Sequence, residues 1–274
     1  MNFWIRLFSS IILVILTAIT VSLGKEVLIA SLLLISVIGY WEFTRATKVN
    51  GSKKLVNFIQ VVGIFGVVGY YISLYLNNQI LVAFLFILTL TAILSVYVVK
   101  FPKYHANQIV NSYFGLIYVP VMLSFVYLTR SLEQGIYIVW LIFISSWISD
   151  TFAYCVGMLI GKHKLAPNLS PKKSIEGSVG GVIASTVVGG LYAYFIVSKH
   201  IDLPGVVWMF ALIGGIGSIV SQVGDLVASG IKRNFDIKDY GHCIPGHGGI
   251  MDRFDSVILV APMIYFLAVF FTNL

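Results

Sequence analysis

Long hydrophobic runs alternate with short polar stretches along the 274 residues of this chain. Each run approaches the ~20 residues with which an α-helix crosses the hydrocarbon core of a bilayer. The pattern therefore predicts an all-α, polytopic membrane protein with about nine transmembrane helices. We place them at 4–23, 26–44, 55–76, 79–98, 108–129, 134–160, 178–198, 205–229 and 254–273.

Composition supports this fold class, because 58% of the residues are hydrophobic and only 11% are charged. A soluble domain of this length carries more charge. The first run has no clear cleavage site and a second helix follows at once, so we interpret it as a retained helix and not a signal peptide. Cys155 and Cys243 are too few for a disulfide framework and are predicted to be plain thiols.

Lys and Arg residues gather on one side of the predicted helices, which indicates the cytoplasmic side. Lys25, Arg130 and Lys199 are the exceptions on the opposite side. The amino terminus and the loops 161–177 and 230–253 are therefore expected in the cytoplasm. The net charge of +7 is not gathered in one tail or on one helix face, which argues against nucleic acid as a partner.

Polar residues and glycines are concentrated in the second half of the chain. We predict that residues 1–130 form a packing and oligomerisation half and that residues 131–274 form the catalytic region. Glu42, near one end of the second helix, is interpreted as an anchor at the membrane interface. Paired small residues such as Gly157 with Gly161 let helices approach closely and are compatible with a homodimer.

Asp150 and Asp225 lie inside predicted helices, where an ionisable group is costly and points to function. Each belongs to a polar stripe with helical spacing, which predicts a water-filled cavity open to the cytoplasm. The alternative is a buried hydrogen bond or ion pair between helices. The stripes comprise Ser145, Ser146, Ser149 and Asp150 in one helix, and Ser218, Ser221, Gln222, Asp225, Ser229 and Lys232 in the other.

The loop 161–177 carries Ser170-Pro171 followed by Lys172 and Lys173. A helix that starts at Ser-Pro can present backbone N–H groups to an anion, with the two ammonium groups beside it. The alternative is that these lysines only anchor the loop at the cytoplasmic face.

The segment 229–255 combines dense mixed charge with a glycine-rich turn that contains His247, Gly248 and Gly249. Its carboxylates, together with Asp225, offer the hard oxygen ligands that suit Mg²⁺. Carboxylates beside basic residues indicate phosphoryl or nucleotidyl transfer. His247 is a candidate catalytic residue, although a lone histidine in a glycine turn is more often structural. The acidic candidates are Asp239, Asp252 and Asp255, and the basic ones are Lys232, Arg233, Lys238 and Arg253.

In these residues the sequence resembles the phosphatidate cytidylyltransferase family, the CDP-diacylglycerol synthases. The family pattern is matched in order by Ser229, Lys232-Arg233, Lys238-Asp239, Pro245-Gly246-His247-Gly248-Gly249 and Asp252-Arg253-Phe254-Asp255. The resemblance extends back to Asp150 and through Ser170-Pro171-Lys172-Lys173 to Asp225. It covers roughly residues 150–262.

The resemblance implies that CTP and phosphatidic acid give CDP-diacylglycerol and pyrophosphate by direct in-line displacement, at the cytoplasmic face of a bacterial inner (plasma) membrane. It implies that Asp225 and Asp252 hold Mg²⁺, with Asp255 as a further candidate ligand and a second, monovalent cation left open. Asp239 is either another ligand or a residue that orders the loop. Phosphate contacts are expected from Lys172, Lys173, Lys232, Arg233 and Arg253, and substrate contacts also from Asp150, Ser170, Ser229, Lys238, Gly248 and Gly249.

Two other functions remain open from the sequence. A related CTP-dependent lipid kinase would transfer the γ-phosphoryl group and release CDP. An ion or solute transporter would use Asp150 and Asp225 as a relay, although such sites usually lie at the bilayer midplane between structural repeats.

Overall fold

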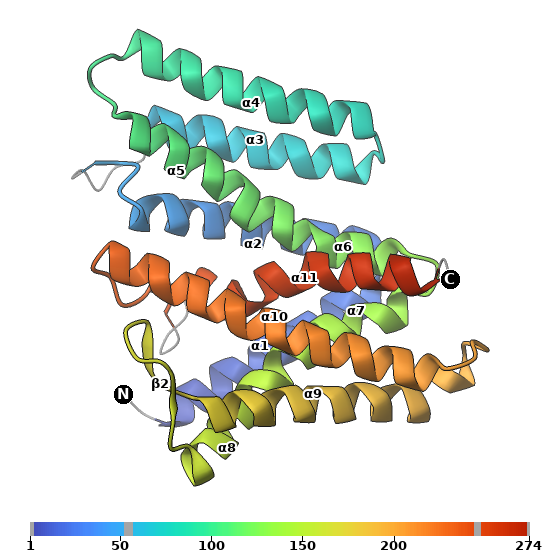
Figure 1. Ribbon diagram of the computed structural model, residues 1–274. Coiled ribbons are helices and arrows are strands. Elements are labelled where there is room, and N and C mark those ends of the chain that lie inside the picture. Colours follow the sequence, from blue (N-terminus) through green and yellow to red (C-terminus); the bar gives the residue numbers. More distant parts are fainter. Residues whose placement is uncertain (1–2, 52–56, 244–247, 273–274) are drawn as a thin grey trace. The chain divides into compact units, whose positions relative to one another are not determined.

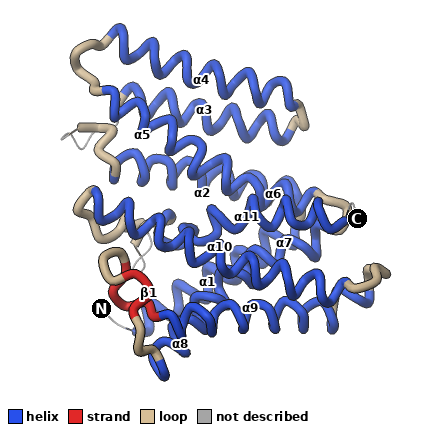
Figure 2. Tube along the Cα trace, viewed as in Figure 1, coloured by secondary structure: helices blue, strands red, loops and turns tan. Residues whose placement is uncertain are grey.

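The computed structural model describes residues 3–51, 57–243 and 248–272, and these residues are almost entirely helical (Figures 1 and 2). The helices of the first half are α1 (Phe3–Leu23), α2 (Lys25–Ala46), α3 (Phe58–Tyr75), α4 (Gln79–Val99), α5 (Ala106–Leu116), the π-helix η1 (Ile117–Val121) and α6 (Met122–Ser131). Those of the second half are α7 (Gly135–Phe143), the π-helix η2 (Ile144–Ile148), α8 (Ser149–Ile160), α9 (Ile175–Phe195), the 3₁₀-helix η3 (Val197–Lys199), α10 (Val206–Asn234) and α11 (Met251–Thr272).

Eight helical spans within the described residues are long and apolar enough to cross a membrane. Two of them, Ala106–Ser131 and Gly135–Ile160, each contain a π-helical segment, η1 or η2. The 21-residue α1 is a further apolar helix, and its segment Ser9–Leu23 is apolar but shorter than these eight spans. The prediction of an all-α, polytopic membrane protein is thereby confirmed.

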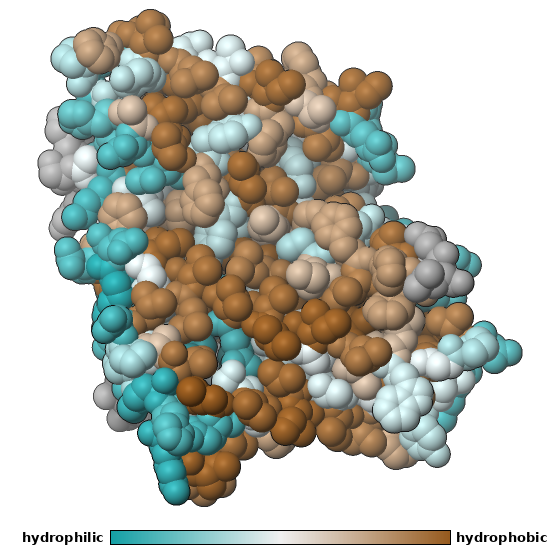
Figure 3. All heavy atoms as spheres, viewed as in Figure 1, coloured by the Kyte–Doolittle hydropathy of each residue, from teal (hydrophilic) through white to brown (hydrophobic). Residues whose placement is uncertain are grey.

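Apolar side chains cover the bodies of the helices, as expected for contact with lipid. Phe65 is 72% exposed, Ile80 83% and Trp208 76%. In Figure 3 hydrophobic residues predominate along the helices, and hydrophilic residues gather near helix ends. Bilayer contact explains why such large side chains are not buried within the protein.

The chain divides into two compact units, which cut across the order of the sequence. The first contains residues 1–124 and 234–253, and the second contains residues 125–233 and 254–274. The loop that follows α10 therefore packs with the amino-terminal helices. The separate roles proposed for residues 1–130 and 131–274 stay predictions.

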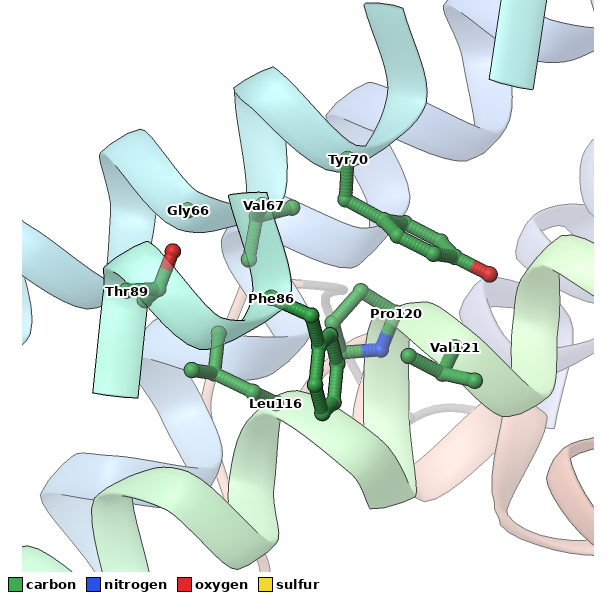
Figure 4. Close-up of a pocket in the computed structure, with 8 residues that line it drawn as sticks. All are labelled: Gly66, Val67, Tyr70, Phe86, Thr89, Leu116, Pro120 and Val121. Atoms are coloured by element: carbon green, nitrogen blue, oxygen red, sulfur yellow. The ribbon is translucent and has the colours of Figure 1, made fainter. Parts of the chain in front are cut away.

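In the first unit, α2, α3 and α5 are joined by buried hydroxyl pairs. Tyr40 bonds to Ser112 at 2.6 Å, and Ser36 bonds to Tyr71 at 2.8 Å. A small apolar cavity of about 10 Å³ lies among α3, α4, α5 and η1, beside Tyr70 and Phe86 (Figure 4). It is at most large enough for about one water molecule, so it is not a substrate pocket.

In the second unit, glycines bring helices into contact. A Cβ added at Gly181 would lie 2.8 Å from the backbone oxygen of Ser149, and one at Gly214 would lie 2.8 Å from that of Ser185. These positions place α8 against α9 and α9 against α10. The close approach expected from the small-residue spacing is confirmed here.

The loop 161–177 contains the only strands among the described residues, a two-stranded antiparallel sheet of β1 (Lys164–Ala166) and β2 (Ser170–Ser174). The helix expected to start at Ser170-Pro171 was therefore predicted wrongly. Helix α9 begins at Ile175, and the Ser174 hydroxyl accepts the Gly177 N–H at 3.2 Å as its N-cap. Strand β2 instead extends Lys172 and Lys173 along the hairpin.

Candidate active site

A charged cluster lies in the second unit, where β2, α8, α10 and α11 supply its members. Lys173 on β2 forms an ion pair with Asp225 on α10. Asp255 on α11 interacts electrostatically with Asp225, with Lys232 on α10 and with Asp150 on α8. We call Asp150, Lys173, Asp225, Lys232 and Asp255 the charged cluster. Residues that are far apart in the sequence thus form one mixed-charge centre.

Backbone contact between α10 and α11 supports this cluster. A Cβ at Gly224 would lie 3.0 Å from the backbone oxygen of Asp255, so the residue next to Asp225 approaches the α11 backbone closely. Asp255 Oδ1 also accepts the Ser256 N–H at 2.9 Å. Asp255 is only 9% exposed, whereas the Asp225 side chain is 25% exposed and can be reached by a ligand.

The two polar stripes do meet, but their inner part is not a water-filled cavity. Ser218 donates to Ser149 at 2.7 Å, and Ser146 pairs with Ser256 at 2.6 Å. The Gln222 amide donates to the Ser178 backbone oxygen at 3.1 Å. The stripe serines at 145, 146, 149, 218 and 221 are all fully buried. The alternative of interhelical hydrogen bonds is correct for Ser145, Ser146, Ser149 and Ser218, because polar groups at this depth need partners within the protein. The buried Ser221 hydroxyl has no hydrogen-bond partner among the described residues.

The hairpin is held to the start of α9 by Glu176. Its carboxylate accepts the Lys162 N–H at 3.1 Å and the His163 N–H at 3.2 Å, and it pairs with His163 Nδ1 at 2.6 Å. These contacts fix both ends of the loop that carries Lys173. An apolar groove of about 500 Å³ starts at Glu176 and runs between α8 and α9, lined by residues such as Val156 and Ile183.

Residues 234–253 of the motif segment belong to the first unit. Asp252 is 9% exposed, and its Oδ2 accepts the N–H groups of Tyr240 at 2.8 Å and Gly249 at 3.0 Å. Asp252 therefore closes the loop before α11. Gly249 is buried, and Gly248 has a φ of 84°, a backbone conformation that favours glycine.

Other predicted site residues vary in exposure. Lys172, Arg233, Lys238 and Asp150 are exposed, and Ser170, Ser229, Lys232, Asp239 and Arg253 are partly buried. Pro245, Gly246 and the candidate catalytic His247 lie outside the described residues. The role of each of these residues toward a substrate stays a prediction, as does the convergence of Asp225 and Asp252 on one ion.

The carboxylates fit a particular kind of metal binding. Among the residues that the structure describes, no three His, Cys, Asp or Glu side chains form a ready metal site. Mg²⁺ commonly takes only one or two carboxylates and completes its octahedron with water and substrate phosphates. Asp225 and Asp255 are both hard oxygen donors. They fit an Mg²⁺ ion that is completed by water and substrate phosphates, and not one enclosed by protein ligands alone.

Sequence reasoning misassigned one residue of this region, Glu42. It is not an interfacial anchor, since its side chain is fully buried and accepts the Met251 N–H at 2.9 Å. The bonded groups are 209 residues apart. The only sequence signal was an acid near the end of a predicted apolar helix, and it did not reveal the partner.

The fold defines a polytopic membrane protein, and the cluster brings carboxylates and lysines together in its second unit. The chain belongs to the cytidylyltransferase family, whose family model matches residues 4–271.

Similar proteins include phosphatidate cytidylyltransferases of three staphylococci. That of Staphylococcus haemolyticus strain JCSC1435 is 43% identical over 152 residues, 56% of each chain. The protein of Staphylococcus saprophyticus is 42% identical over 149 residues, 54% of this chain and 55% of its own. The protein of Staphylococcus aureus strain COL is 43% identical over 152 residues, 56% of each chain. The chain thus spans about half the length of the curated relatives it matches.

Proposed function

We propose that this protein transfers a cytidylyl group from CTP to phosphatidic acid, giving CDP-diacylglycerol and pyrophosphate for phospholipid synthesis. The observation that carries the proposal is the charged cluster around Asp225, found in a polytopic membrane chain of the cytidylyltransferase family. The names of the staphylococcal relatives supply the substrates.

The chemistry requires charge neutralisation and alignment more than a strong base. A phosphatidate phosphate oxygen attacks the α-phosphorus of CTP, a new P–O bond forms, and the bond to the β-phosphate oxygen breaks, releasing pyrophosphate. Phosphatidate is already ionised at neutral pH, so little proton transfer is needed. This is in-line displacement, in which positioning and electrostatic stabilisation provide most of the rate.

The lysines of the cluster act on phosphate oxygens. Lys173 lies beside Asp225, so a phosphate that binds near this carboxylate is next to its ammonium group. Lys232 is one of the charges that act on Asp255 and contributes a second positive charge from α10. Lys172 is exposed on the same strand as Lys173 and is available to the phosphate of the lipid.

Asp225 and Asp255 are the residues in this unit that would hold Mg²⁺, with Asp252 as the further predicted ligand. When bound, Mg²⁺ would neutralise charge on the triphosphate and polarise its phosphorus–oxygen bonds. Lys173 and Lys232 keep the carboxylates from repelling an incoming anion. The apolar groove between α8 and α9 offers a surface for an acyl chain beside the hairpin.

The test is a labelling experiment with purified protein, Mg²⁺ and phosphatidic acid in mixed micelles. CTP labelled at the α-phosphate should place its label in the lipid, and CTP labelled at the γ-phosphate should release labelled pyrophosphate. Transfer of the γ-label to lipid, with release of CDP, would establish a lipid kinase instead. Absence of any lipid product would reject both transferase reactions and leave the transporter to be tested by flux assays.

A further inference from the structure

The carboxylate of Glu42 joins α2 to the loop that precedes α11. Its side chain is 0% exposed, and Oε2 accepts the Met251 N–H at 2.9 Å. Met251 is the first residue of α11, where backbone N–H groups lack partners within the helix. A carboxylate at this position makes a charge-assisted hydrogen bond and interacts favourably with the helix dipole, which offsets part of the cost of its burial.

The loop approaches Glu42 so closely that a side chain at either of two glycines would displace the Glu42 carboxylate. A methyl group added at Gly241 or at Gly249 would collide with the Glu42 carboxylate. Gly249 belongs to the glycine-rich turn in which the sequence resembles the phosphatidate cytidylyltransferases, whereas Gly241 precedes this turn. The carboxylate therefore lies between the two ends of the loop and touches both.

Two neighbours of Glu42 on α2 also hold this loop. Arg45 donates from Nη2 to the Tyr240 backbone oxygen at 3.3 Å. The rings of Phe43 and Tyr240 are stacked, with centroids 6.4 Å apart and planes at 24°. Tyr240 is almost fully buried, at 1% exposed. Helix α2 thus fixes the start of the loop through Tyr240 and its end through Met251.

Asp252 also holds this loop, through hydrogen bonds to the loop backbone. Its Oδ2 accepts the N–H groups of Tyr240 and Gly249, while Glu42 takes that of Met251. Both carboxylates therefore bind backbone donors of one short segment. Any movement of Met251 relative to α2 also moves Asp252, the next residue in the same helix.

We propose that Glu42 is a positioning residue, which holds residues 240–243 and 248–252 in the conformation that fixes the positions of Asp252 and Gly249. For its catalytic consequence the proposal rests on the proposed function. Glu42 acts through the backbone of this loop, to which its carboxylate is hydrogen-bonded. The amino-terminal helices then set the geometry of the motif and do more than pack against lipid.

The experiment combines backbone hydrogen exchange of peptides from 238–253 with steady-state kinetics. Glu42→Gln keeps the size of the side chain and removes its charge, Glu42→Ala removes the contact, and Glu42→Asp restores the charge on a shorter side chain. Glu26→Gln is the matched control, because Glu26 is an exposed acid on the same helix. Gly241→Ala disturbs the contact from the loop side.

We expect exchange in this segment to accelerate at least about 10-fold in Glu42→Gln and more in Glu42→Ala, since charged hydrogen bonds protect these amides. kcat should fall about 10- to 100-fold, as expected when a site is misplaced by about 1 Å, while the KM for phosphatidate stays unchanged. Glu42→Asp should recover part of both effects, and Glu26→Gln should resemble wild type.

Wild-type exchange in Glu42→Gln and Gly241→Ala would overturn the proposal. So would a fully active Glu42→Ala enzyme. If a Glu42 variant does not fold, Gly241→Ala still tests the contact. If the wild-type protein makes no CDP-diacylglycerol, the proposed function fails, yet the exchange measurement still decides whether Glu42 holds the loop.

Discussion

The ion pair between Lys173 and Asp225 joins the hairpin to α10. We expect removal of each side chain to affect kcat and KM differently. Asp225→Ala should lower kcat by at least about 100-fold, because lost electrostatic stabilisation of a developing phosphate charge costs this much. Lys173→Ala should instead raise the KM for the phosphorylated substrates as well as lower kcat. Initial rates with varied CTP and phosphatidate would separate the two effects.

Asp202→Ala is the control for the Asp225 prediction, since Asp202 is an exposed acid between η3 and α10. It should keep wild-type activity. Full activity in Asp225→Ala, with the protein still folded, would remove Asp225 from the metal and phosphate site.

The thiol of Cys243 reports on the charge of Glu42. Partial desolvation raises the pKa of Cys243, the nearby Glu42 carboxylate raises it further, and the Arg45 guanidinium and a hydrogen bond with the His242 backbone lower it. The thiolate is the reactive form. In a Cys155→Ser background, Glu42→Gln should therefore move the midpoint of the alkylation rate against pH to a lower value.

The limiting rate separates charge from accessibility, because loosening of the loop would relieve the desolvation of Cys243 and lower the midpoint, but would raise the limiting rate as well. A lower midpoint at an unchanged limiting rate therefore assigns the shift to the lost charge. Glu26→Gln should leave the midpoint in place. An unchanged midpoint in Glu42→Gln would mean that the carboxylate does not act on the thiol.

Some elements of the fold could be predicted from the sequence and others could not. The long helices followed from hydrophobic length alone, because a bilayer sets the length and every backbone group must be satisfied within the helix. The hairpin of β1 and β2 was missed, since its strands have three and five residues and are mostly polar. Its lysines were found but were assigned to a helix start.

In the candidate site, too, some residues were predicted from the sequence and others were not. Asp225 and Lys173 stood out as charges in or near apolar segments, and the structure pairs them. The role of Glu42 could not be predicted, because its partner is the backbone N–H of Met251. Every residue type except proline has this group, so the sequence does not show which one Glu42 binds. The polar stripes were recognised, but only packing distinguishes the buried Ser218–Ser149 hydrogen bond from a wet cavity.

Helix contacts in the second unit depend on glycine, which gives a prediction for stability. Gly181→Ala would place its methyl 2.8 Å from the Ser149 backbone oxygen, so α8 and α9 must separate. We expect a loss of about 1–3 kcal/mol, as for overpacked cores, seen as a lower thermal unfolding midpoint in detergent.

Gly230→Ala is the matched control on α10, where the nearest atom to an added Cβ is 3.5 Å away, at Leu169. Alanine also favours a helix by about 1 kcal/mol over glycine, so this variant should unfold at the same temperature or higher. Equal loss in both variants would show that the Gly181 contact does not hold the helices together.

At the scale of the whole molecule, the basic residues predict which loops face the cytoplasm. The two cysteines allow a direct test without new labelling sites. Cys243 is exposed in the loop after α10, and Cys155 lies within the apolar span Gly135–Ile160.

A polar, membrane-impermeant maleimide should label Cys243 in inverted membrane vesicles and not in right-side-out vesicles. Cys155 should stay unlabelled in both, because hydrocarbon excludes the reagent and a thiolate there is costly. Labelling of Cys243 in right-side-out vesicles would place the motif loop outside the cell, away from CTP, and would contradict both the orientation and the proposed reaction.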